Sequence, residues 1–296
     1  ELAKPDSMGK VSGWGWSFGY FGGMLTLGIC LAYVIWAQGQ KIPASEFVPV
    51  TMLITAAIYG LASLVTFWLL KERGQVNVES LAEGGFIASL HQLRRTARQA
   101  RRYTDFKWLM ACAVFYQGGI AVAIALAAVY AEQEIGFKPQ ETMVLIFVLN
   151  LAAAAGSFAW GYLQDRVGHK RALGATLVGW TVVCVLAAAS STKLEFWVAC
   201  TIAGLCMGSS QSAGRALAGV FAPPLQRAEF YGLWTFALRL ASIIGPLSYG
   251  TITWVTGGNQ RLAILSTAGL FIMGLVILTR VNVERGRQAA LMQSGP

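Results

Sequence analysis

Charge-free apolar stretches recur along the whole chain, and each is about as long as a membrane-spanning helix. The hydrocarbon core of a bilayer is about 30 Å thick, so a helix needs about 20 apolar residues to cross it. Seven stretches reach about that length without Asp, Glu, Lys or Arg, namely residues 11–40, 47–70, 108–131, 142–164, 172–192, 196–214 and 262–279. An eighth, residues 230–260, contains only Arg239. The sequence therefore predicts an all-α membrane protein with eight transmembrane helices.

The overall composition agrees with this prediction and argues against an ordinary soluble enzyme. Of the 296 residues, 55% are hydrophobic and only 12% are charged, and the mean hydropathy is +0.55. Such a composition is typical of chains that lie in lipid. All five cysteines, Cys30, Cys112, Cys184, Cys200 and Cys206, fall in apolar stretches without a Cys-x-x-Cys pair. We expect them to be packing residues, with neither a disulfide framework nor a zinc site.

The 23 Lys and Arg residues follow a membrane topology. If the N-terminal segment is inside and the spans alternate, eighteen of these cations fall in inside segments. The outside segments hold Lys41, Lys138, Lys193 and Arg261. Short loops rich in Lys and Arg stay in the cytoplasm, so we expect both termini there, in a protein of the cell membrane. The topology accounts for the net charge of +9 without a nucleic-acid partner, and the basic side would face the anionic inner leaflet.

One long connection divides the predicted spans. Residues 1–70 hold two helices, residues 71–107 form a basic cytoplasmic linker, residues 108–280 hold six helices and residues 281–296 form a cytoplasmic tail. Within the linker, apolar residues recur at roughly helical spacing among arginines, which predicts an amphipathic helix on the inner leaflet. This helix is either a charged linker that holds the topology or a regulatory, partner-binding element. The first apolar run shows no signal-peptide cleavage pattern. Because the chain begins with Glu rather than Met, we expect that it does not start at the native N-terminus, unless translation begins at Met8.

Glycines in the first span suggest a packing surface. Gly15, Gly19 and Gly23 are four residues apart and lie on one face of a helix, where they would let a neighbouring backbone approach closely. The same smooth face would also permit sliding between helices. Tryptophans near span ends, including Trp14 and Trp16, are expected at the membrane–water interface.

The most specific motif is GYLQDRVGHKR, residues 161–171, in an inside turn. Glycines permit a tight turn, cations anchor it to the inner leaflet, and Asp165 can accept charge-assisted hydrogen bonds. We expect the free N–H groups at the start of the seventh span, after Pro223 and Pro224, to be its donors, in a contact that acts as a gate. The alternative is a basic turn without such a role. The motif residues are Gly161, Leu163, Asp165, Arg166, Gly168, Lys170 and Arg171, with His169 in place of one basic residue.

These residues resemble the Gly-x-Leu-x-Asp-Arg-x-Gly-Arg-Lys-Arg loop of the major facilitator superfamily. Four further runs are similar to the branch that contains the autophagy-related vacuolar amino-acid effluxers and their bacterial relatives: GWGWSFGYFGG (13–23), GGIAVAIALAAVYAEQEIG (118–136), GSSQSAGRALAGVFAPPLQRAEFYGLW (208–234) and RLASIIGPLSYG (239–250). The resemblance implies twelve helices in two halves that work by alternating access. The eight spans would then be helices five to twelve, with the N-terminal four helices missing from the chain.

Polar side chains inside the spans are candidates for a substrate pathway, because such groups are costly in lipid. Arg239, Gln117 and Asn150 each lie near the middle of a span, where one midplane cavity could collect them, and Gln211 lies nearer the inner end of its span. The guanidinium of Arg239 suits a carboxylate or phosphate. Alternatively, Arg239 ties helices together, and Gln211 bonds a neighbouring helix.

The chain departs from the resembling branch where related sequences tend to carry a polar–acidic pair, since it has Gln117 and Gly118 instead. No carboxylate lies deep in any predicted span, so the residues present supply no obvious carrier for proton coupling.

These patterns together predict a secondary active transporter that moves a small polar solute, with amino-acid efflux suggested by the resemblance. No nucleophile, metal set or paired carboxylate lies at depth, so we expect neither an enzyme nor a cofactor or metal. A channel is the weaker hypothesis, because polar rings and filter loops are missing from the spans. A non-transporting membrane protein, or a fragment that needs a separate N-terminal half, remains an alternative.

Overall fold

The computed structural model describes residues 7–70 and 103–292, and within this part of the chain every regular element is a helix. The long helices are α1 (Met8–Gly39), α2 (Ala44–Leu69), α5 (Thr104–Gln133), α6 (Pro139–Val167), α7 (His169–Ala189), α8 (Lys193–Phe221), α9 (Arg227–Val255) and α10 (Gln260–Thr279). A short 3-10 helix, η1 (Pro224–Gln226), precedes α9, and α11 (Val283–Met292) ends the described chain. The amphipathic helix predicted within the linker falls mainly on residues 71–102, outside the described residues.

Seven of these helices are long and apolar enough to cross a membrane, in agreement with a multi-pass integral membrane protein. Helix α8 is not among the seven, although it lies where the sixth span was predicted. Its second half contains Ser209, Ser210, Gln211 and Ser212, which lower its hydropathy. Eight described long helices therefore lie at the predicted positions, but only seven of them are candidate membrane spans by length and composition.

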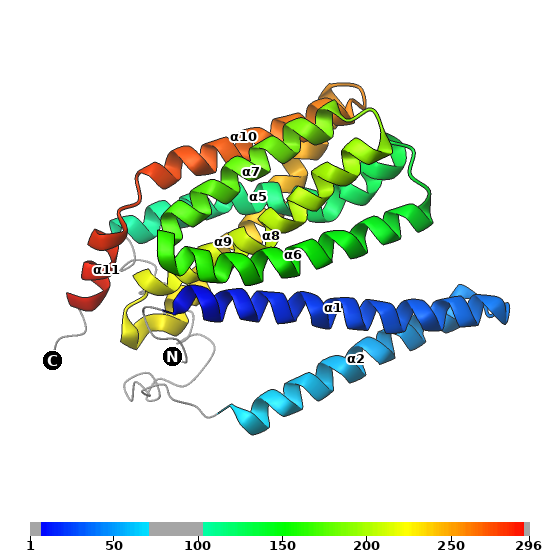
Figure 1. The fold of residues 1–296 in the computed structure, drawn as a ribbon, viewed down its shortest axis with the longest axis horizontal. Helices are drawn as coiled ribbons and strands as arrows, with labels where there is room; N and C mark the ends of the chain where they lie inside the picture. Colours follow the sequence, from blue (N-terminus) through cyan, green and yellow to red (C-terminus); the bar gives the residue numbers. More distant parts are fainter. Residues whose placement is uncertain (1–6, 71–102, 293–296) are drawn as a thin grey trace.

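Helices α5 to α10 pack side by side as a bundle, and α1 lies along α6 and α8 (Figure 1). Helix α2 turns back at the far end of α1 and leans away from the bundle, so that none of its residues is buried. Both described termini lie at one end, together with α11 (Figure 1). We call this the α11 end of the bundle.

The core is built around α8. Most of this helix is buried between α1, α6 and α7, and small residues along it let these neighbours approach. Trp180 of α7 stacks on Phe271 of α10 with ring centroids 5.1 Å apart. Polar side chains of α8 find partners here, since the Trp180 indole donates to Ser210 Oγ at 3.3 Å. The polarity of α8 is therefore directed into protein contacts rather than lipid.

Helices α1 and α6 approach closely at glycines other than those expected. A Cβ added at Gly13 would lie 2.5 Å from the Ser157 carbonyl oxygen and 2.8 Å from Gly161 Cα. At Gly15, Gly19 and Gly23, by contrast, an added Cβ meets no described atom within 4 Å, and all three glycines are exposed. The glycine spacing predicted a packing face on this helix. It named the wrong face for contacts among the described residues, because Gly9, Gly13 and Ser17 face α6 and α8 instead.

The predicted C-terminal tail contains a docked helix. Asp105 of α5 is 3% exposed, and Arg285 of α11 donates hydrogen bonds to its carboxylate from Nε and Nη2, both at 2.7 Å. The backbone N–H of Asn282 donates to the same carboxylate at 2.7 Å. The Asp105 carboxylate accordingly raises the pKa of the Arg285 guanidinium above its usual value. Residues 283–292 are therefore part of the folded unit.

Candidate functional site

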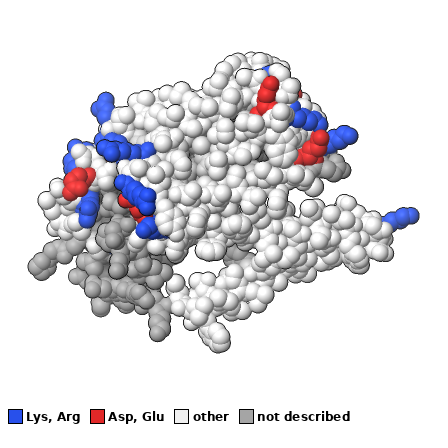
Figure 2. Space-filling view, in the orientation of Figure 1, with Lys and Arg blue, Asp and Glu red and all other residues white. Residues whose placement is uncertain are grey.

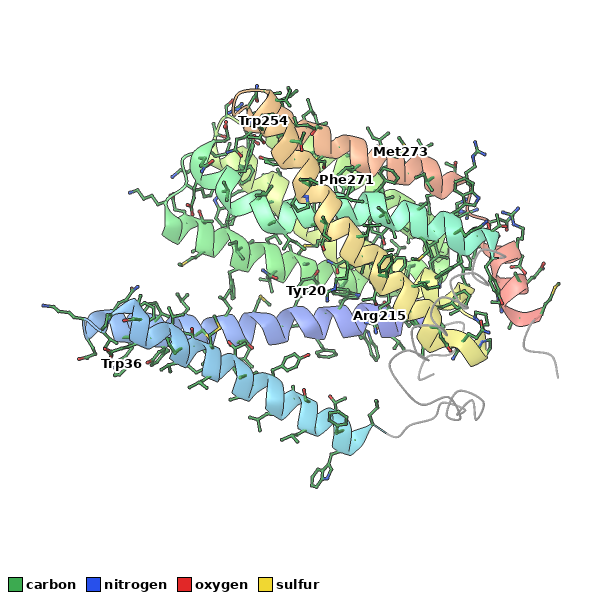
Figure 3. The ribbon with its side chains drawn as sticks, turned by 180° about the vertical axis from the view of Figure 1, so that it is seen from behind. Tyr20, Trp36, Arg215, Trp254, Phe271 and Met273 are labelled. Atoms are coloured by element: carbon green, nitrogen blue, oxygen red, sulfur yellow. The ribbon has the colours of Figure 1, made fainter. Side chains whose placement is uncertain are left out.

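A cavity of about 400 Å³ lies inside the bundle. It is lined by residues of α1, α5, α6, α7, α8, α9 and α10, so every long helix except α2 contributes. The lining is mainly apolar and aromatic, with small residues on α5 and α8 leaving the space open. Figure 3 shows Phe271 among the packed helices and Tyr20 on α1 beside them. A cavity of this size suits a small solute.

A few polar groups reach this cavity. Gln211 Nε2 lies 3.5 Å from the Tyr20 hydroxyl, which links α8 to α1 across the cavity wall. Asn150 Nδ2 donates to the Ile146 carbonyl of its own helix at 2.8 Å, and its Oδ1 accepts no hydrogen bond from the described residues. The indole N–H of Trp16 is buried and unpartnered within the described structure. Such an arrangement offers stacking surfaces, with single donors and acceptors to orient a solute.

The four predicted pathway residues separate into two groups. Asn150 and Gln211 line the cavity. Gln117 is buried but does not reach it, and its Nε2 instead donates to the Tyr116 hydroxyl at 3.3 Å. Arg239 is exposed on α9 and is not part of the lining. Its guanidinium has no partner among the residues that the structure describes, so the predicted gathering of Arg239, Gln117 and Asn150 at one cavity is not observed.

Aromatic residues of the cavity wall were missed by reasoning from the sequence. Trp16, Tyr20, Trp180 and Tyr249 all line it. Trp16 was expected at the membrane interface, but it points into the bundle and its ring lies 5.9 Å from that of Tyr20. Their helical spacing was visible, because Trp16 and Tyr20 are four residues apart on the face that also carries Gly9 and Gly13. No charged side chain of the described residues lines the cavity.

The motif carboxylate of Asp165 binds a helix N-terminus, but not the expected one. Its Oδ1 accepts a hydrogen bond from the Gly9 N–H at 2.8 Å, and its Oδ2 accepts one from the Lys10 N–H at 3.0 Å. Both donors lie in the first turn of α1, whereas the start of α9 was predicted. The physical reason given for the contact holds, since a carboxylate stabilises the free N–H groups and positive end of a helix. The prediction chose the wrong helix, because it did not consider the one that begins at Met8.

The neighbouring amide extends this contact to a third helix. Gln164 Nε2 donates to the Gly9 carbonyl at 2.9 Å and to Ser212 Oγ at 3.0 Å. Ser12 Oγ in turn donates to the Ser212 carbonyl at 2.9 Å. Gln164 and Ser212 are buried. Two successive residues of α6 therefore tie α1 and α8 together at the α11 end; we call these contacts the α1–α6–α8 junction.

The rest of the motif forms the turn between α6 and α7. Gly168 has φ +91°, a left-handed conformation that favours glycine, as the sequence predicted for a tight turn. Lys170 Nζ donates to the carbonyls of Thr279 and Val281 at 3.2 and 2.6 Å, which closes the end of α10. Arg166 and Arg171 are exposed, and their side chains make no hydrogen bond or ion pair within the described structure.

Metal-binding side chains are not gathered anywhere in the described ranges, where no three His, Cys, Asp or Glu residues lie close enough to hold an ion. The five cysteines are free.

Solved structures of similar fold belong to the major facilitator superfamily. The outward conformation of the transporter FucP aligns with a TM-score of 0.67 and 18% identity, covering 95% of this chain and 70% of FucP. The human organic anion transporter MFSD10 aligns with a TM-score of 0.68 and 17% identity, covering 94% and 65%. At this identity the likeness concerns the fold. The helical bundle and its internal cavity define a multi-pass membrane protein with the major facilitator fold.

The family described as vacuole effluxer Atg22 like matches residues 3–291, and the chain belongs to this family. The MFS-type transporter YxiO of Bacillus subtilis is 27% identical over 99% of this chain and 68% of its own length. Autophagy-related protein 22-1 of Penicillium rubens is 23% identical, and its Aspergillus niger counterpart 25%. The chain covers 50% and 49% of these two proteins, so it spans about half the length of its fungal relatives.

Proposed function

We propose that this protein is a secondary active transporter that moves a small polar solute by alternating access, with amino acids as the first class to test. Family membership supports transport, since the family is described as one of effluxers. The observation that carries the proposal is the cavity of about 400 Å³, which lies inside the bundle and is lined by seven of its helices. A solute held there would be released when helices separate at one end, as in transporters with a central site.

Two cavity residues are the proposed polar contacts for the solute. The free Oδ1 of Asn150 can accept a hydrogen bond, and Gln211 can exchange its long contact with Tyr20 for a bond to the solute. Gln117 and Arg239 remain weaker proposals. Arg239 would reach a solute only through contacts outside the described residues, because it faces away from the cavity.

The α1–α6–α8 junction is the proposed gate. Asp165 and Gln164 hold α1 against α6 and α8 at one end of the bundle, and these hydrogen bonds would break when that end opens. Arg166, Gly168, Lys170 and Arg171 would shape the turn that moves with them. In this proposal α8 also crosses the membrane and brings the number of spans to eight. The described long helices then correspond to helices five to twelve of a twelve-helix transporter, and the α11 end faces the cytoplasm.

A filling substitution tests the transport site. The intact chain is reconstituted in liposomes, with and without a co-expressed N-terminal half from a relative, and uptake of labelled amino acids is measured. Ala203→Phe places a ring in the cavity wall and should lower the initial rate at least tenfold. The control, Ala57→Phe, makes the same change on the exposed face of α2 and should leave the rate unchanged.

The outcomes separate the alternatives. Saturable uptake with counterflow supports a carrier, whereas flux that rises linearly with concentration indicates a channel. Equal rates for Ala203→Phe and Ala57→Phe would show that the cavity is not the transport site. Uptake that needs the added half would identify the chain as one part of a transporter.

A further inference from the structure

A second, surface-open pocket of about 730 Å³ lies at the α11 end, away from the central cavity. The ends of α7, α10 and α11 surround it. Its cations are Lys170, Arg171, Arg280 and Arg285, and no Asp or Glu lines it. Lys and Arg side chains gather at this end of the molecule in Figure 2. We call this feature the basic pocket.

Two of its cations are held in place by the fold. Lys170 Nζ is fixed by the carbonyls of Thr279 and Val281. Arg285 is fixed by the buried carboxylate of Asp105, which accepts hydrogen bonds from its Nε and Nη2. The other N–H groups of the Arg285 guanidinium remain free. The charge of Asp105 offsets one of the four cations, so the basic pocket keeps a net positive charge.

The other two cations have no partner. Arg171 and Arg280 are exposed, and their guanidinium groups make no hydrogen bond or ion pair with any described residue. They stand at the start of α7 and the end of α10, on two sides of the same pocket. Two free guanidinium groups beside two fixed cations offer the planar, bidentate donors that phosphate oxygens accept.

The remaining wall indicates where the phosphate would come from. Gly174, Leu275 and Leu278 line the pocket, and they belong to α7 and α10, which are apolar enough to span a membrane. A soluble anion would gain nothing from this wall, whereas a phospholipid would place its phosphate among the cations and its acyl chains along the two helices. We propose that the basic pocket binds the phosphate group of an anionic phospholipid. Basic pockets between helix ends at a membrane surface are suited to such headgroups.

Lipid binding to the purified chain tests this proposal. Native mass spectrometry of the detergent-solubilised protein counts bound phosphatidylglycerol and phosphatidylcholine during titration. Each basic residue near an anionic surface contributes about 1 kcal/mol, so Arg171→Gln with Arg280→Gln should weaken phosphatidylglycerol binding about thirtyfold. The matched control, Arg215→Gln with Arg287→Gln, removes two exposed cations that lie outside the pocket and should weaken it less than about threefold.

A second variant tests the pocket without changing charge. A Cβ at Gly174 would lie 3.7 Å from Leu278 Cδ2 and 3.8 Å from Leu275 Cδ1, which is ordinary contact. Gly174→Leu extends from this Cβ into the pocket, and it should fill the apolar wall and lower phosphatidylglycerol binding at least fivefold, with a Tm equal to that of the unmodified protein showing that it folds. Equal losses in the two arginine pairs, unchanged binding in Gly174→Leu, or equal affinity for phosphatidylcholine would each overturn the proposal. Displacement of the lipid by millimolar inorganic phosphate or glycerol phosphate would show that the site takes free phosphate instead.

Discussion

Asp165 illustrates how one side chain can join two segments that lie far apart in the sequence. Its carboxylate accepts the Gly9 and Lys10 N–H groups of α1, which have no partner within their own helix. The adjacent Gln164 donates hydrogen bonds to the carbonyl of Gly9 and the hydroxyl of Ser212. Because Gln164 is buried, loss of these bonds leaves polar groups without water, which makes the junction sensitive to single substitutions.

Replacing Asp165 with Asn should weaken the junction while keeping its shape. The amide retains one acceptor but loses the negative charge at the N-terminus of α1 and one of the two hydrogen bonds. We expect the free energy of unfolding to fall by about 1–2 kcal/mol. Thermal unfolding in detergent should show a Tm lower by several degrees, roughly 2–4 °C for each kcal/mol.

The control for this variant is Glu132→Gln. It makes the same carboxylate-to-amide change at an exposed position of α5 where no hydrogen bond is observed, and its Tm should equal that of the unmodified protein. If Asp165→Asn also leaves the Tm unchanged, the two backbone hydrogen bonds contribute nothing to the stability of the fold.

Between elements, the contact of α1 with α6 depends on which face of α1 is turned inward. Gly13 sits against the Ser157 carbonyl and Gly161, so the two backbones nearly touch. Gly15, two residues later, lies on the exposed face of α1, where an added Cβ would meet no described atom within 4 Å. Small residues permit such an approach only on the contacting face.

Alanine substitutions should distinguish the two faces. Gly13→Ala places a methyl group 2.5 Å from a backbone oxygen, so helices must separate, and we expect a loss of about 1–3 kcal/mol in the free energy of unfolding. Gly15→Ala meets nothing within 4 Å and should be neutral or stabilise by up to about 1 kcal/mol through helix propensity. Tm measurements on both variants check this, and equal destabilisation would contradict the observed α1–α6 contact.

The sequence predicted the elements better than it predicted their orientation. Span positions depend on local length and charge, so all eight predicted stretches coincide with a long helix. The rotation of a helix about its axis is set by its partners, which explains why Arg239 is exposed on α9 rather than in the cavity wall. Similarly, the turn at Gly168 was predictable from local chemistry, whereas the pairing of Asp165 with α1 required knowledge of which helix ends meet.

For the whole molecule, charge differs between the two ends of the bundle. Among the described residues, the α11 end carries cations in the helix ends beside its connections, at the start of α7, at the start of α9 and in α11. The opposite end holds Lys41, Lys138, Lys193 and Arg261. Two of these four, Lys193 and Arg261, face carboxylates in ion pairs with Glu141 and Glu134. The excess at the α11 end favours a cytoplasmic position for it.

Cysteine labelling in intact cells should confirm this orientation. Gln288→Cys lies on α11, and Ser191→Cys lies in the α7–α8 turn at the opposite end; both positions are exposed. A membrane-impermeant maleimide should label Ser191→Cys in intact cells and Gln288→Cys only after the cells are opened. The five native cysteines lie within helices, three of them buried, which keeps the background low. Labelling of Gln288→Cys in intact cells would reverse the topology.

The position of α8 has a consequence for how the protein is made. This helix is too polar to qualify as a membrane span by composition, yet its serines and Gln211 are buried against α1, α6 and α7. A segment of this kind gains little from entering lipid alone, because its polar side chains would lack partners there. Its insertion during synthesis would depend on helices that precede it in the chain and are already in the membrane. The order of the helices along the sequence, with α8 following α1, α6 and α7, supplies those partners before α8 emerges from the ribosome.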